Sequence, residues 1–326
     1  MKNTKLATFG AVAAVGLMAT GAFAADKWDM PMAYSDSNYH TQNGKKFAEM
    51  VNACAAGEIE VVVHGGGSLF KGNEIKRAVQ TGQAPMGERL LSAHQNENAI
   101  FGVDSVPFLA TSFGASDKLW KASRPTVEKI LAAQNLVLLY GVPWPPQGLY
   151  FNKEINSTAD MKGLKFRAYN AATAKLAELS GMLPVQIEAA ELVQALATGV
   201  AEAFISSGST GYDRKVWEHL SHFYDTQAWL PRNYVFVNKD SWDGASDKVK
   251  SCLKDSAAKA EAAGTAKAAE LAGWYLEQLA ANGMKVQPAG DQLKMDLGKI
   301  GETMASEWVG KAGAEGKAIL DAYKAM

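Results

Sequence analysis

One arginine in the sequence stands where it could bind an anion. In residues 164–170 (LKFRAYN), alternating side chains predict a β-strand that places Arg167 and Tyr169 on the face opposite Phe166. The strand ends at Asn170, which can cap a following helix, so Arg167 lies near the carboxyl end, where open α/β sheets bind ligands. A guanidinium there can bind a carboxylate through two parallel hydrogen bonds. A solvated arginine on an exposed strand is the alternative interpretation.

Aromatic, amide and cationic side chains near the ends of other predicted elements are further candidates for a binding cleft. For each aromatic residue the alternative is ordinary core packing, and Arg89 fits a surface position equally well. Trp144 is favoured as a cleft wall because prolines flank it. The candidates beside Arg167 are Tyr34, Tyr39 and His40 after the first strand, Arg89, Trp144, Gln147, Tyr169, Asn170, Ser207, Tyr212 and Trp229.

Signatures of enzymes and of metal sites are missing from the sequence. It contains no Gly-x-Ser-x-Gly elbow, no phosphate-binding loop and no dinucleotide fingerprint. The glycines of residues 65–68 (GGGS) lack the lysine of a phosphate loop, so a tight turn is the better interpretation. His219 and His222 are three apart on a possible helix, but no third ligand is near in sequence. We therefore expect no catalytic residue, no metal and no cofactor.

The first 24 residues are typical of a secretory signal peptide. Two lysines are followed by an apolar run over residues 6–18, and the sequence Ala22-Phe23-Ala24 predicts cleavage after Ala24. The run is too short to span a bilayer, and no later stretch is long and apolar enough, so we expect a periplasmic protein that does not itself cross the membrane. The net charge of −1 at pH 7 excludes the basic surface of a nucleic-acid binder.

The sequence has two cysteines, Cys54 and Cys252. Export would place both in an oxidising compartment, which favours a disulfide. Spacing in the sequence gives no distance between the two side chains, so two buried thiols are an equal alternative.

Predicted strands and helices alternate, which indicates α/β layers with mainly parallel strand pairing. The expected strands are residues 28–33, 59–64, 136–142, 164–169, 183–187, 203–206 and 234–237, and the expected helices are 41–54, 73–81, 116–133, 171–180 and 188–198. Residues 74–82 and 191–199 share a pattern that ends in Thr-Gly, which suggests two related halves.

A long helix is expected from Ser246, a suitable N-cap, to Asn282. About 36 residues at 1.5 Å each give roughly 54 Å, which exceeds the width of a small domain. Such a helix has to lie across two domains or kink at Gly264 or Gly273.

Several segments of the chain are similar, in order, to one family. Residues 160–167 (DMKGLKFR) resemble the "DLKGLKIR" signature of the DctP-type periplasmic solute-binding proteins of TRAP transporters. Further segments that resemble the family are residues 57–61 (GEIEV), 106–109 (VPFL), 183–185 (LPV) and 191–203 (ELVQALATGVAEA). The agreement covers nearly the whole chain after residue 24.

The resemblance implies a two-lobed α/β fold of the type II-like periplasmic binding proteins, with mixed sheets flanked by helices and a long helix spanning both lobes. The expected boundaries are 25–143 plus 228–262 for lobe I, and 144–227 plus 263–326 for lobe II. The resemblance also implies that the ligand binds in the cleft between lobes. Delivery would be to the membrane subunits of a TRAP permease, and Arg167 would pair with the substrate carboxylate.

Two departures from the family pattern bear on the ligand. Some members that bind sialic acid carry a second arginine where this chain has residues 144–148 (WPPQG), with Gln147 its only long polar side chain. Residues 206–209 (SSGS) stand where an "EN" or "QN" pair often occurs. We therefore expect a compact monocarboxylate, such as a 2-oxo, 2-hydroxy or aromatic acid. The alternatives are a ligand-binding subunit for a chemoreceptor or sensor kinase and, from the enzyme class, a periplasmic lyase or hydrolase.

Overall fold

The computed structural model describes residues 25–326, so the expected signal peptide, residues 1–24, lies outside the described part. The strands are β1 (Asp26–Pro31), β2 (Ile59–His64), β3 (Met86–Leu90), β4 (Leu136–Pro143), β5 (Gln147–Phe151), β6 (Lys165–Ala168), β7 (Leu183–Gln186), β8 (Ala203–Ser207), β9 (His222–Asp225), β10 (Arg232–Asn238) and β11 (Lys285–Pro288). The α-helices are α1 (Tyr39–Cys54), α2 (Gly72–Gln80), α3 (Phe113–Ala133), α4 (Ala171–Leu179), α5 (Leu192–Ala197), α6 (Gly208–Asp213), α7 (Lys239–Gly244), α8 (Asp247–Ala281) and α9 (Asp291–Lys324).

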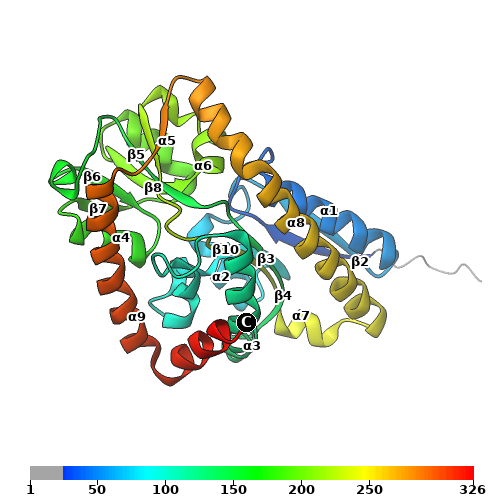
Figure 1. The fold of residues 1–326 in the computed structure, drawn as a ribbon. Helices are drawn as coiled ribbons and strands as arrows, with labels where there is room; N and C mark the ends of the chain where they lie inside the picture. The colour runs from blue at the N-terminus through cyan, green and yellow to red at the C-terminus, as the bar shows by residue number, and fades with distance from the viewer. Residues whose placement is uncertain (1–24) are drawn as a thin grey trace, which may run out of the picture.

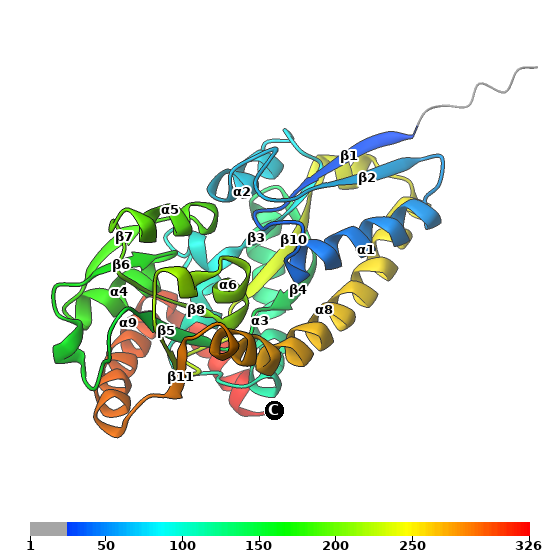
Figure 2. The same cartoon turned by 90° about the horizontal axis from the view of Figure 1, so that it is seen from above.

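The strands form two groups, which we call lobe I and lobe II (Figures 1 and 2). Lobe I contains the parallel pair β1–β2 and the antiparallel sheet β3–β10–β4. Its central strand, β10, is rich in aromatic and β-branched residues and is buried along its whole length. Lobe II is one sheet of order β11–β9–β5–β8–β6–β7. It mixes parallel and antiparallel pairs, so the pairing is less uniformly parallel than the alternation of elements suggests.

The two-lobed α/β fold expected from the sequence is therefore confirmed. The strand that carries Arg167, β6, pairs in parallel with β7 on one side and with β8 on the other. Because all three strands run the same way, their carboxyl ends lie at one edge of the sheet. That edge faces lobe I, because Glu188, which follows β7, forms hydrogen bonds with Arg89 of β3.

Two extended segments cross between the lobes side by side. The first joins β4 to β5 and the second joins β9 to β10. The backbone N–H of Trp144 donates to the carbonyl of Pro231 at 2.7 Å, and that of Gln147 donates to the carbonyl of Trp229 at 3.0 Å. These hydrogen bonds satisfy the backbone where it leaves the sheets and make the two crossings one narrow connection.

The long helix expected between residues 246 and 282 is confirmed as α8, whose 35 residues give a length of about 52 Å. The Ser246 hydroxyl accepts from the backbone N–H of Val249 and so caps its first turn. The helix packs on α1 and β4 of lobe I and on α6 of lobe II. It continues through Gly264, where an added Cβ would lie 2.7 Å from the Val142 side chain. This glycine is therefore needed for close helix–strand packing and does not break the helix.

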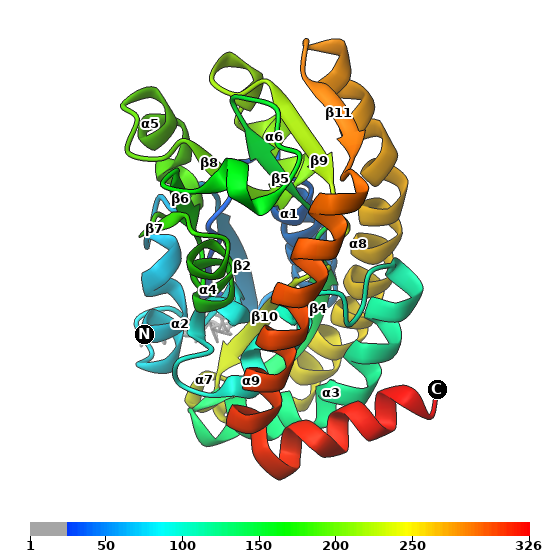
Figure 3. The same cartoon turned by 60° about the vertical axis from the view of Figure 1, so that its left-hand side comes forward.

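The C-terminal helix, α9, was not predicted from the sequence. Figures 1 and 3 show that it leaves lobe II, passes α4 and bends sharply before the chain ends near α3. Gly313 lies at the bend, with a φ of 57° that other residues rarely adopt. Beyond the middle of the helix, Trp308 and Tyr323 donate side-chain hydrogen bonds to the lobe I carbonyls of Ala99 and Leu109. The segment proposed for lobe II, residues 263–326, therefore includes an end of α9 that contacts lobe I.

The possible helix at His219 and His222 is absent from the structure. His219 and His222 do not share a helix, because His219 follows a short 3₁₀ helix (Val216–Glu218) and His222 begins β9. Within residues 25–326, no three His, Cys, Asp or Glu side chains are grouped as metal ligands. In the same part of the chain, none of the helices has both the length and the apolar character that crossing a bilayer requires.

Cys54 and Cys252 form a disulfide. It joins the end of α1 to the first turns of α8, both of which lie on lobe I. The sequence left this pairing open, because the two residues are 198 positions apart.

Replacing both cysteines with serine should lower the free energy of unfolding by about 2–4 kcal/mol, since the disulfide restricts the unfolded chain. Urea unfolding of the wild type and of the double variant, each with and without reductant, measures the difference. The wild type should lose stability on reduction and the variant should not. Equal midpoints for oxidised and reduced wild type would contradict the prediction.

Candidate ligand-binding site

A small cavity lies where the carboxyl ends of the lobe II strands meet lobe I. It measures about 40 Å³, counted as the space that the centres of water molecules can reach. Its walls come from both lobes and from the crossing segments. The lining residues are Tyr34, Arg89, Leu90, Trp144, Gln147, Arg167, Tyr169, Glu188, Ala189, Ser206, Thr210 and Pro231.

Arg167 is the cation in this cavity whose terminal nitrogens are free. Its side chain is held by one hydrogen bond, from Nε to the carbonyl of Ile187 at 2.9 Å, and its guanidinium lies over the Tyr169 ring at 5.2 Å. No described residue accepts a hydrogen bond from its two terminal nitrogens. The residue is only 3% exposed, and this burial lowers the pKa of its guanidinium. A buried cation with two parallel free donors is suited to a carboxylate.

The second guanidinium in the cavity, that of Arg89, is already paired. Its two terminal nitrogens donate to the two carboxylate oxygens of Glu188, at 3.1 Å and 3.0 Å. Arg89 belongs to β3 of lobe I, whereas Glu188 follows β7 of lobe II. The pair therefore forms a bidentate bridge across the cavity from one lobe to the other.

A chain of hydrogen bonds fixes the floor of the cavity. The Tyr169 hydroxyl accepts from Nε1 of Trp229 at 3.0 Å and donates to Oε1 of Gln147 at 3.2 Å. The amide of Gln147 donates in turn to the carbonyl of Pro145 at 3.0 Å. Burial raises the pKa of Tyr169 above its ordinary value, so the hydroxyl stays protonated. Tyr169 and Gln147 thus hold each other in place, and Trp229 supports Tyr169 from outside the cavity lining.

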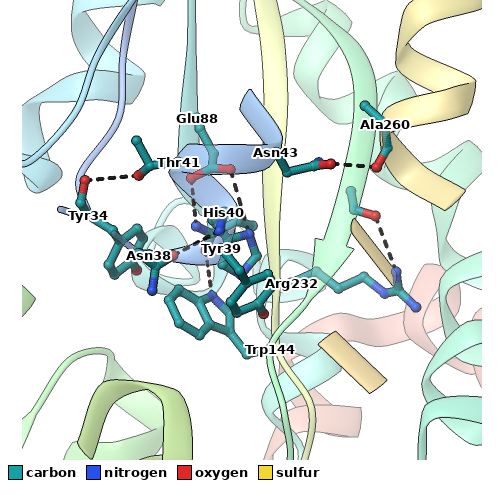
Figure 4. A network of polar contacts seen from close by, with 12 residues as sticks. Tyr34, Asn38, Tyr39, His40, Thr41, Asn43, Glu88, Trp144, Arg232 and Ala260 are labelled. Carbon is teal, nitrogen blue, oxygen red and sulfur yellow. Dashed lines mark hydrogen bonds and ion pairs between the residues drawn. The ribbon is translucent and has the colours of Figure 1, made fainter. Parts of the chain in front are cut away.

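Trp144 is held in place from lobe I. Its Nε1 donates to Oδ1 of Asn233 at 2.8 Å, and the Asn233 amide donates to Oε1 of Glu88 at 2.9 Å. The His40 ring packs against the indole with centroids 4.2 Å apart, and Figure 4 shows His40 between Trp144 and Glu88. This arrangement fixes the plane of the indole that Trp144 presents to the cavity.

The His40–Glu88 pair behind Trp144 is fully buried. Nδ1 of His40 lies 3.7 Å from Oε2 of Glu88, and neither ring nitrogen has a hydrogen-bond partner. Burial raises the pKa of Glu88 to about 8 and lowers that of His40 well below its ordinary value. Both shifts favour the neutral forms of the two side chains.

The structure brings together about half of the side chains expected at the cleft. Tyr34, Arg89, Trp144, Gln147, Arg167 and Tyr169 line the cavity. Tyr39, His40 and Trp229 lie behind these walls. Asn170 caps α4 and donates to the Ser92 hydroxyl at 3.0 Å, Ser207 is buried at the end of β8, and Tyr212 packs on Trp274. Direct ligand contact by this second group stays a prediction.

Sequence reasoning missed six of the lining residues, namely Leu90, Glu188, Ala189, Ser206, Thr210 and Pro231. We expected residues 188–198 to form one helix, whereas Glu188 lies in the turn between β7 and the 3₁₀ helix Ala189–Glu191. The rule used for Arg167 could have found Glu188, since it follows a strand parallel to β6 and comes at the same edge of the sheet.

Known proteins agree with this fold. The family described as bacterial extracellular solute-binding protein, family 7 (DctP), matches residues 31–308. The chain belongs to this family. It is thus one of the extracellular solute-binding proteins, a family of binding proteins and not of enzymes.

Two solved structures and one curated protein are close relatives of this solute-binding protein. A marine metagenome TRAP solute-binding protein specific for pyroglutamate, from an unidentified microbe, is 60% identical, with a TM-score of 0.92 over 93% of this chain and 100% of that one. DctP6 of Bordetella pertussis, a receptor binding pyroglutamic acid, is 47% identical, with a TM-score of 0.90 over 92% and 100%. A monocarboxylate 2-oxoacid-binding periplasmic protein of Nostoc sp. is 25% identical over 86% of this chain and 78% of its own.

The buried pair behind Trp144 predicts a particular dependence of stability on pH. Because folding raises the pKa of Glu88 to about 8, its contribution is fully present below the unfolded pKa of about 4.5 and is lost as pH rises through about 8. A Glu88→Gln variant cannot titrate at this position. The stability of wild type relative to Glu88→Gln should therefore fall as pH rises from 5 to 8, by on the order of 1 kcal/mol per pH unit at most.

Urea unfolding at several pH values measures this difference. Glu49→Gln, which changes an exposed glutamate on α1, is the matched control and should follow the wild type at every pH. A constant difference between wild type and Glu88→Gln from pH 5 to pH 8 would show that Glu88 is ionised in the folded protein.

Proposed function

We propose that this protein captures pyroglutamate in the cavity at Arg167, between the two lobes, and delivers it to the membrane subunits of a TRAP permease. The observation that carries the proposal is a buried guanidinium with two free terminal nitrogens in a small, mostly neutral cavity. The 60% identity to a pyroglutamate-specific relative supports the choice of acid. Delivery to a permease rests on the family alone.

The chemistry of pyroglutamate suits these walls. It is a five-membered lactam ring with one carboxylate, so it carries a single negative charge opposite the one unpaired cation. Its ring is compact and partly apolar, which suits the aromatic walls made by Tyr34 and Trp144. Its lactam N–H and C=O need one acceptor and one donor, and the hydroxyls of Ser206 and Thr210 in the lining can serve as either.

Removal of Arg167 should abolish most of the binding. An Arg167→Ala variant leaves the ligand carboxylate without its partner in a buried site, a loss of about 3–5 kcal/mol, or roughly two to four orders of magnitude in Kd. Arg167→Lys should recover only part, because one ammonium cannot make two parallel hydrogen bonds. Isothermal titration calorimetry with pyroglutamate measures all three proteins.

Arg77→Ala, which removes an exposed arginine from α2, is the control and should bind like the wild type. Thermal melting without ligand shows whether the variants are folded. If Arg167→Ala kept its affinity within about threefold and melted normally, the ligand would not bind at this arginine. If the wild type bound no pyroglutamate, the choice of acid would be wrong.

Ligand entry should require the lobes to separate, because the cavity is small and cross-lobe bonds close it. Besides the Arg89–Glu188 bridge, the amide of Asn38 donates to Asp213 at 2.6 Å across the lobes. We expect bending at the crossing segments, residues 142–146 and 226–231, and within α8. Small-angle scattering should give a smaller radius of gyration with saturating pyroglutamate than without it, and an equal radius would contradict closure.

A further inference from the structure

The cavity holds two guanidiniums, but the charge of one of them is already balanced. Each terminal nitrogen of Arg89 donates to one oxygen of Glu188, although Nε of Arg89 has no hydrogen-bond partner among the described residues. We propose that Glu188 is a specificity-determining residue, which occupies Arg89 and thereby restricts the site to acids with one carboxylate. This inference rests on the proposed function, because it concerns the ligand held at Arg167.

The cavity lining carries one net positive charge. Arg89 and Arg167 are positive and Glu188 is negative. An acid with one carboxylate neutralises the net charge. A second carboxylate would find its cation already paired and would be buried without a partner, which is unfavourable. If Glu188 were neutral, the two charges of an acid with two carboxylates would be balanced by Arg89 and Arg167.

The geometry shows that the pair is held firmly. Arg89 lies in β3 opposite Tyr234 of β10, and its side chain is only 5% exposed. The first residue of α2, Gly72, packs against the pair: a Cβ there would lie 2.8 Å from Oε2 of Glu188 and 2.9 Å from Nη1 of Arg89. A side chain at this position would displace the bridge, so the start of α2 leaves just enough space for it.

The pair also links selection to closure. The two residues are 99 positions apart and come from opposite lobes, so their hydrogen bonds require the lobes to be together. An acid that competes for Arg89 would break a bond of the closed arrangement. An acid that binds at Arg167 alone would leave it intact.

The test compares two acids with five carbons, pyroglutamate and glutarate, by isothermal titration calorimetry. Glu188→Gln should raise the affinity for glutarate relative to pyroglutamate by at least about tenfold, because Arg89 becomes available to the second carboxylate. Glu191→Gln removes the same charge from an exposed glutamate three residues away and should leave the ratio unchanged.

The double variant Arg89→Gln/Glu188→Gln separates the role of Arg89 from a general charge effect. It restores one net positive charge and, unlike Glu188→Gln, does not leave Arg89 buried without its partner, so it also covers the case in which Glu188→Gln does not fold. Its selectivity should return to within about threefold of the wild type. A double variant that prefers glutarate would overturn the inference.

The remaining outcomes distinguish this inference from the proposed function. If the wild type binds pyroglutamate and Glu188→Gln leaves the ratio unchanged, or weakens both acids equally, the bridge serves only closure and the inference alone fails. If the wild type binds glutarate and not pyroglutamate, both the proposed function and the inference fail.

Discussion

The organisation of this protein depends on one buried positive charge. Arg167 is held away from water by its strand, its aromatic neighbour and a single carbonyl hydrogen bond, with its terminal nitrogens left without protein acceptors. A buried ion without a partner is costly, which favours an anion beside Arg167. The parallel arrangement of β6 between β7 and β8 puts this charge at the sheet edge that meets the other lobe.

The two lobes supply different parts of the site. Lobe II provides the free cation and Tyr169, lobe I provides Tyr34, and the first crossing segment provides Trp144. Trp144 is fixed through Asn233 to Glu88, while Tyr169 is fixed by Gln147 and Trp229 at the crossing segments. Because these supports are satisfied within the protein, few polar groups remain to accept unrelated ligands. Under the proposed function, recognition depends on the number of charges on the acid and on the size of its ring.

Local patterns could be predicted from the sequence, and long-range pairings could not. Alternation along residues 164–170 found β6, and a serine cap before an alanine-rich run found α8. β5 was missed because prolines precede it and its first residue looks like part of a loop, and α9 because glycines interrupt its pattern. The bridge from Arg89 to Glu188 joins residues 99 apart and leaves no local signal. Arg167 was proposed from a local strand and cap together with the family signature at residues 160–167.

The disulfide between Cys54 and Cys252 closes a covalent ring that contains every strand from β2 to β10. The strands β5–β9 of lobe II therefore form an insertion within that ring. A proteolytic cut in any one of their loops would leave the polypeptide in one piece, with α1 still joined to the start of α8. Lobe II can thus be damaged, or can open locally, without releasing the N-terminal strands from the helix that spans the molecule.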